Sequence, residues 1–81
     1  MKVRVLYFGI VKERLGLASE EHQLDDGATV AALMDLLAAR HDVFKLGAGS
    51  LRVAVDREYV DSDRVLSDNA EVAIIPPVAG G

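Results

Sequence analysis

Polar and apolar residues alternate along the start of the chain, with β-branched and aromatic side chains among them. This period of two predicts a β-strand over residues 2–8. One face of that strand carries Val3, Val5 and Tyr7, and the other carries Arg4, Leu6 and Phe8. Gly9 interrupts the alternation, and residues 10–16 are typical of a short helix that ends at Gly16.

The clearest predicted element is an amphipathic helix that follows a turn at residues 25–27. Thr29 is a suitable N-cap, because its hydroxyl can accept a hydrogen bond from the first helical turn. Apolar residues recur with the spacing of one helical face, at Val30, Leu33, Met34 and Leu37. Burying each of these side chains contributes about 1.5–3 kcal/mol before the loss of entropy is subtracted. We expect this helix to be the main cover of the core.

The rest of the chain predicts further strands joined by turns. Residues 19–24 are polar and typical of an edge strand, residues 51–55 alternate, and residues 59–60 suit a short return strand. Residues 61–69 favour a short helical segment followed by a turn, and residues 72–75 suit the last strand. A sheet covered on one face by a single main helix, an α+β architecture, is the economical packing for this length.

Both faces of the expected sheet carry apolar side chains. If the valines of the first, middle and last strands face the helix, then Ala73 and several larger residues face away from it. With the first and last strands adjacent, the larger residues form a partner-binding patch of Leu6, Phe8, Tyr59 and Ile75. The alternative is that some of them pack under loops or at the sheet edge.

Composition narrows the possible functions. The 81 residues suit one domain, and nine Lys and Arg against thirteen Asp and Glu give a net charge of −4. No basic run could follow a nucleic-acid backbone, and no apolar stretch approaches the roughly 20 residues that span a bilayer. The chain has no cysteine, which excludes disulfides and thiolate nucleophiles. We therefore expect a cytoplasmic protein that binds neither nucleic acid nor membrane.

Candidate catalytic residues are sparse. His22 and His41 are far apart and have no metal-ligand spacing, so they are interpreted as a strand-surface and a helix-terminal histidine. The acidic pairs at 20–21 and 25–26 are interpreted as solvated surface, and no serine has a neighbouring base motif. We expect no metal site and no independent active site.

The last six residues, PPVAGG, are the unusual feature. We divide the chain into a domain at 1–75 and a flexible tail at 76–81. Pro76 and Pro77 hold φ near −65° and favour an extended stem, whereas Gly80 and Gly81 leave the tip bare. Between them lie a small apolar residue and a small spacer, Val78 and Ala79. These features favour a tail that is the working part of the protein over a disordered remnant.

The whole pattern resembles the ubiquitin-like sulfur carriers, and within them the small subunits of molybdopterin synthase. The resemblance rests on the segments VRVLYFG, VKERLG, ATVAALMDLL, VAVDREYV and LSDNAEVAIIPPVAGG, of which the Pro-Pro-x-x-Gly-Gly end is the most specific. It implies a β-grasp fold, with a mixed sheet packed on one main helix. Where the family commonly has Asp-Gly before the last strand, this chain has Asp68-Asn69, and Asn adopts the same backbone conformation.

The resemblance also implies a mechanism and partners. A ubiquitin-activating-like adenylyltransferase uses MgATP to adenylate the carboxylate of Gly81, and a sulfur donor enzyme converts it to a thiocarboxylate. The tail then enters the large subunit of molybdopterin synthase, in a heterotetramer with two copies of each subunit, and passes sulfur to a cyclic pterin precursor. In this scheme the chain itself binds no cofactor, and the docking residues are Leu6, Phe8, Tyr59 and Ile75.

Three alternatives stay open on the sequence alone. A thiamine-pathway sulfur carrier shares the fold and the Gly-Gly end, although the Pro-Pro stem favours the pterin role. A ubiquitin-like modifier joined to lysines uses the same activated terminus. A plain interaction module with an inert tail predicts that Gly81 is dispensable.

Overall fold

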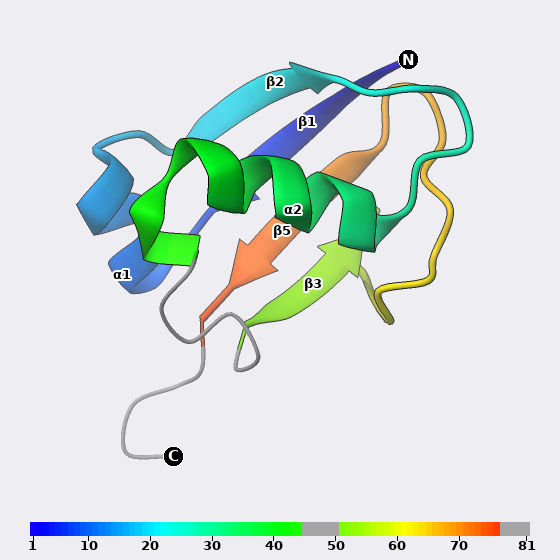
Figure 1. The fold of residues 1–81 in the computed structure, drawn as a ribbon. Coiled ribbons are helices and arrows are strands. Elements are labelled where there is room, and N and C mark those ends of the chain that lie inside the picture. The colour runs from blue at the N-terminus through cyan, green and yellow to red at the C-terminus, as the bar shows by residue number, and fades with distance from the viewer. Residues whose placement is uncertain (45–50, 77–81) are drawn as a thin grey trace.

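The computed structural model describes residues 1–44 and 51–76 (Figure 1). Its elements in chain order are β1 (Lys2–Tyr7), α1 (Gly9–Leu15), β2 (Ser19–Gln23), α2 (Val30–Arg40), the 3₁₀ turn η1 (Asp42–Phe44), β3 (Arg52–Val55), β4 (Glu58–Val60) and β5 (Glu71–Ile75). Within these ranges, no helix is long and apolar enough to cross a membrane.

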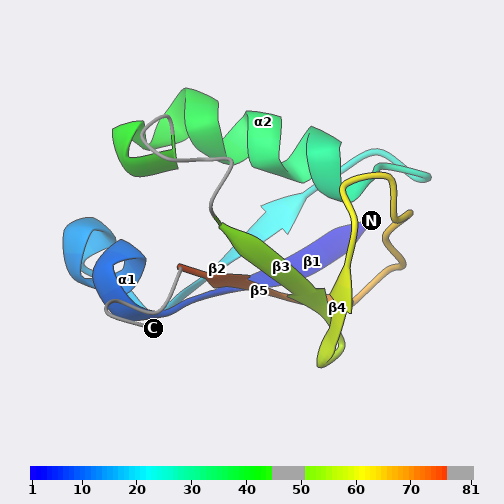
Figure 2. The ribbon, with the colours of Figure 1, turned by 90° about the horizontal axis from the view of Figure 1, so that it is seen from below.

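The five strands form one mixed sheet in the order β2-β1-β5-β3-β4. The central strands β1 and β5 are parallel, whereas the β1–β2, β3–β5 and β3–β4 pairs are antiparallel. Figure 2 shows α2 on one face of this sheet and α1 beyond one end of it. The first and last strands are therefore neighbours, and the predicted mixed sheet packed on one main helix is confirmed.

The core lies between α2 and the sheet. There the apolar side chains at every second strand position pack against the apolar face of the helix. Val3 and Val5 of β1 and Ile74 of β5 are fully buried, and so are Leu33 and Leu37 of α2. The helix begins as predicted, because the Thr29 hydroxyl accepts a hydrogen bond from the Ala32 amide at 3.2 Å. Two expected core residues, Met34 and Leu51, pack against the core but stay partly exposed.

The predicted helical segment at 61–69 is wrong. The chain forms two turns there, and Leu66 is buried between them with 3% of its surface exposed. Its amide donates to the Ala28 carbonyl at 2.8 Å, and Val65 forms a β-bridge with Thr29. Because these contacts reach across to the segment before α2, the amides do not form a local helical ladder. Asn69 has φ of +65°, as expected of this turn.

Candidate docking and tail site

A row of neighbouring residues crosses the face of the sheet opposite α2. Leu6 of β1 lies beside Ala73 of β5. Ala73 lies in turn beside Ala54 of β3, which pairs with Tyr59 of β4. Because the two alanines between them are small, the larger side chains of Leu6 and Tyr59 stand out at the two ends of the row. Tyr59 is 61% exposed. The row is therefore a shallow apolar surface that spans four strands.

Two further apolar residues extend this surface toward the end of the sheet where β5 leads into the tail. Ile75 is partly buried and pairs with Arg52 of β3. Phe8 follows β1 with an extended backbone and is 45% exposed. Together with the ends of the row, they make the surface that we call the docking patch: Leu6, Phe8, Tyr59 and Ile75. The strand pairing thus puts Leu6, Tyr59 and Ile75 on the outer face of the sheet, while the binding role of all four residues stays a prediction.

Pro76 follows directly after Ile75 and packs over Gly9. Gly9 has φ of +57°, and a Cβ added there would stand 2.9 Å from Cγ of Pro76. Any side chain at Gly9 would strain the backbone and also displace Pro76. The root of the tail is therefore seated against the beginning of α1. The other predicted tail residues lie outside the described residues: Pro77, Val78, Ala79, Gly80 and Gly81.

A hydrogen-bonded cluster lies under the C-terminal end of α2. The Tyr7 hydroxyl donates to Oε1 of Glu20 at 2.6 Å, and Nε2 of His41 contacts the same oxygen at 3.1 Å. Phe44 closes the cluster, with its ring centroid 5.8 Å from that of Tyr7 and 6.0 Å from that of His41. Nε2 of His22 is buried 3.7 Å from Glu20 and has no hydrogen-bond partner among the described residues. The Glu20 carboxylate of β2 thus bonds to Tyr7 of β1 and to His41, the residue that caps α2.

The surroundings of Glu20 and Tyr7 perturb their pKa values in opposite directions. Burial alone raises the pKa of Glu20, but the hydrogen bonds from Tyr7 and His41 and the neighbouring histidines outweigh it, so the pKa lies below 4.5. Burial, followed by the hydrogen bond to Glu20, raises the pKa of the Tyr7 hydroxyl. The pair is therefore a carboxylate accepting from a protonated phenol over the ordinary range of pH.

This cluster corrects the sequence interpretation of its members. Glu20 and His22 were expected on the surface, yet His22 is 4% exposed and the Glu20 side chain is 24% exposed. Both point toward α2, because they pair with Val5 and Val3, whose side chains form the core. The alternation of side chains along β2 was the sequence signal that could have placed Glu20 and His22 on the same, inward face. No group of three or more acidic or histidine residues in the described ranges could hold a metal ion.

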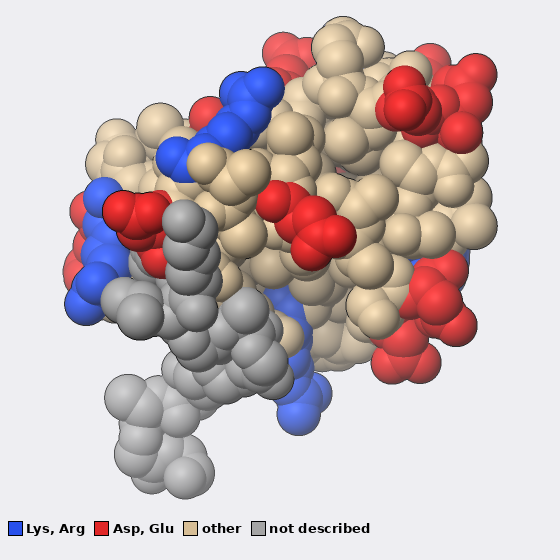
Figure 3. Space-filling model, viewed as in Figure 1, with Lys and Arg blue, Asp and Glu red and all other residues tan. Residues whose placement is uncertain are grey.

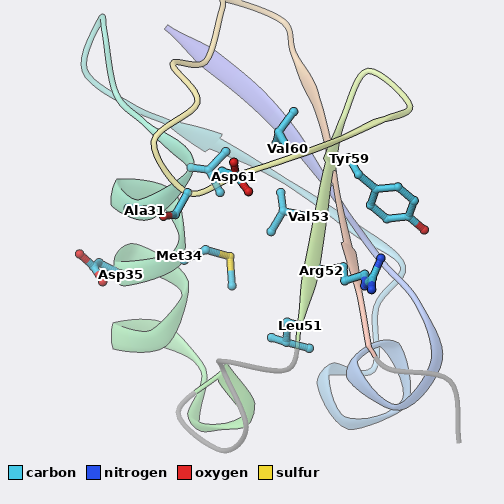
Figure 4. Close-up of a pocket in the computed structure, with 11 residues that line it drawn as sticks. Ala31, Met34, Asp35, Leu51, Arg52, Val53, Tyr59, Val60 and Asp61 are labelled. Atoms are coloured by element: carbon cyan, nitrogen blue, oxygen red, sulfur yellow. The ribbon is translucent and has the colours of Figure 1, made fainter.

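A hollow of about 630 Å³ lies between α2 and the β3–β4 hairpin. Figure 4 shows Met34 and Val53 pointing toward one another across it, with Leu51 at one end. The described residues that line it include no histidine or lysine that could act as a base. The lining does include two carboxylates, Asp35 and Asp61.

Charged side chains do not gather into a basic patch on the face of the molecule that carries α2. Figure 3 shows acidic residues spread over this face, with lysine and arginine only in separate places. The described residues on this face therefore lack the continuous positive charge that would follow a phosphate backbone.

Comparisons of the sequence with known proteins identify a family and its relatives. Residues 5–81 match the model of the ThiS family. The molybdopterin synthase sulfur carrier subunit of Escherichia coli is 40% identical over 81 residues, which cover 98% of this chain and 99% of the relative.

Solved structures show the same fold. A putative molybdopterin converting factor, subunit 1, from Pyrococcus furiosus has a TM-score of 0.86 at 32% identity, covering 96% of this chain and 99% of the other. A complex of subunits 1 and 2 of the molybdopterin-converting factor from Helicobacter pylori contains a chain with a TM-score of 0.75 at 24% identity, with full coverage of both chains. The predicted ubiquitin-like β-grasp fold is thus confirmed. Because the family model matches nearly the whole length of this chain, the chain belongs to the ThiS family.

Proposed function

We propose that this chain is the sulfur carrier subunit of a molybdopterin synthase and carries sulfur as a thiocarboxylate on Gly81. The observation that carries the proposal is the 40% identity to the sulfur carrier subunit of Escherichia coli over 98% of this chain. The Pro-Pro-x-x-Gly-Gly sequence at 76–81 supports a role for the tail as the carrier of the sulfur. In this proposal the domain binds the partner enzymes, the tail carries the sulfur to them, and the partner enzymes catalyse the reactions.

The chemistry must overcome the low reactivity of a carboxylate, whose negative charge repels nucleophiles. In our proposal, a ubiquitin-activating-like adenylyltransferase binds MgATP, and the Gly81 carboxylate oxygen attacks the α-phosphate with release of pyrophosphate. Hydrosulfide supplied by a donor enzyme then attacks the acyl carbon, forms the C–S bond and displaces AMP, which leaves a thiocarboxylate. Gly81 suits these steps because no side chain obstructs its carbonyl carbon. The chain itself needs no bound cofactor for this role.

The second half of the cycle takes place in the large subunit, where sulfur passes from Gly81 to a cyclic pterin precursor. The Helicobacter pylori complex of subunits 1 and 2 supports the large subunit as a partner. We further propose a heterotetramer with two copies of each subunit, in the cytoplasm. The docking patch serves both the large subunit and the adenylyltransferase, so that their binding is mutually exclusive.

The position of Pro76 supports a role for docking in directing the tail. Ile75 of the docking patch is followed immediately by Pro76, which is seated on Gly9. A partner that covers Ile75 therefore also lies at the root of the tail. As an extended polyproline segment, residues 77–81 would reach about 15 Å further. A stiff stem loses less entropy than a flexible one when it enters a channel.

The experiment that tests this function is intact mass spectrometry of the chain after incubation with the adenylyltransferase, MgATP and a sulfur source. We expect a mass increase that corresponds to one oxygen replaced by sulfur. The tail variant Ala79→Ser, which keeps a small spacer, should be loaded equally. Adducts linked to lysines would favour a protein modifier, and an unchanged mass would favour an inert tail. Transfer of the sulfur to the thiazole precursor, instead of the pterin, would favour the thiamine pathway.

A further inference from the structure

Arg52 is a charged residue within an apolar part of the outer sheet face. Its strand partner is Ile75, and its guanidinium carbon lies 5.7 Å from the centroid of the Tyr59 ring. Figure 4 shows Arg52 and Tyr59 pointing to the opposite side of β3 from Val53, which faces α2. Two of the four residues of the docking patch therefore flank this guanidinium.

The charge of Arg52 has no carboxylate partner within residues 1–44 and 51–76. The side chain is exposed, and the ring of Tyr59 provides its described contact. A guanidinium over an aromatic ring is held by a cation–π attraction, which restricts its orientation before any partner binds. Arg52 thus presents a positive charge without an ion-pair partner among the described residues, and the Tyr59 ring restricts the orientation of its hydrogen-bond donors.

We propose that Arg52 sets the specificity of docking by pairing with a carboxylate on the large subunit, an inference that rests on the proposed function. A partner surface that covers Tyr59 and Ile75 removes the guanidinium from water. Burying an unpaired charge is costly, so the covering surface has to supply an acceptor. An Asp or Glu in an otherwise apolar surface fits best, because a carboxylate accepts two parallel hydrogen bonds from an arginine. A surface with a lysine or an apolar side chain opposite Arg52 is rejected.

The test measures the affinity of the folded chain for the large subunit of its own molybdopterin synthase by calorimetry. The variant Arg52→Glu should weaken binding by about tenfold or more, because it places two carboxylates against one another. Arg52→Lys keeps the charge but loses the planar fork, so its affinity should lie between those of Arg52→Glu and the wild type. Circular dichroism should show an unchanged fold in both variants, since Arg52 is exposed.

Arg64→Glu is the matched control, with the same change of net charge on the other side of the molecule. The carbonyl of Arg64 accepts a hydrogen bond from the Val30 amide at 2.9 Å, which places it beside the start of α2. This control should change the affinity by less than about threefold. Equal affinities of the Arg52→Glu and Arg64→Glu variants would overturn the inference. If Ile75→Ala still weakened binding, the proposed function would stand; failure of the wild type to bind would contradict both.

Discussion

The hydroxyl of Tyr7 donates a 2.6 Å hydrogen bond to Glu20, which joins the central strand β1 to the edge strand β2 inside the fold. Tyr7 is 1% exposed and lies opposite Ile74 in the parallel β1–β5 pair. The contact therefore lies at the end of the core from which Ile75 and Pro76 lead into the tail.

Removing this hydroxyl should destabilise the fold without changing its shape. Tyr7→Phe deletes the donor but keeps the ring that packs against Phe44. Because hydrogen bonds to charged groups contribute about 1.5–3 kcal/mol, we expect the free energy of unfolding to fall by that amount. Urea denaturation measures it. Tyr59→Phe is the control, since Tyr59 is exposed, and equal stability of the two variants would show that the contact is weak.

The lowered pKa of Glu20 predicts a particular dependence of stability on pH. A carboxyl whose pKa is lower in the folded than in the unfolded state stabilises the fold above the unfolded value, near 4.5. That stabilisation is lost as the pH falls below 4.5 and through the lower folded value. Glu20→Gln should therefore flatten the decline in unfolding free energy across this acidic window. Glu21→Gln, an exposed neighbour that pairs with Lys2, should keep the decline of the wild type. A decline unchanged in Glu20→Gln would contradict the assignment.

The period of the apolar residues and the N-cap were sufficient to predict the main helix and the strands at the two ends of the chain. The adjacency of those strands followed from the expected packing of one helix on a sheet. These signals failed where long-range contacts decide the structure. The amide of Leu66 bonds to Ala28, a contact that no local pattern signals. His22 was placed on the surface because edge strands are usually polar, whereas β2 lies partly beneath α2 and turns alternate residues inward. The seating of Pro76 on Gly9 likewise depends on two segments that are far apart in sequence.

That seating can be tested with two glycines at opposite ends of α1. Gly9 and Gly16 have φ of +57° and +74°, so valine strains the backbone at either position. A Cβ added at Gly16 meets nothing within 4 Å, whereas one added at Gly9 meets Pro76. Both variants should lose stability, but only Gly9→Val should also lower the rate of sulfur loading measured at a temperature where both are folded. Equal loading rates would show that the tail does not need this seat.

The docking patch should contribute binding energy through its apolar side chains. Phe8→Ala and Ile75→Ala should each weaken binding to the large subunit by about 1 kcal/mol or more if they are anchors. Val65→Ala is the comparison, because Val65 is 55% exposed in the segment before β5 and lies outside the patch. Affinities that match those of Val65→Ala would mean that Phe8 and Ile75 do not contact the partner.

The central claim is that sulfur rides on Gly81, and tandem mass spectrometry of the C-terminal peptide tests it most directly. After loading, the account predicts a peptide whose added sulfur fragments with Gly81 and disappears when the large subunit and the cyclic pterin precursor are added. A variant lacking Gly81 should stay folded and receive no sulfur. Sulfur on any other residue, or normal loading of the shortened chain, would contradict the account.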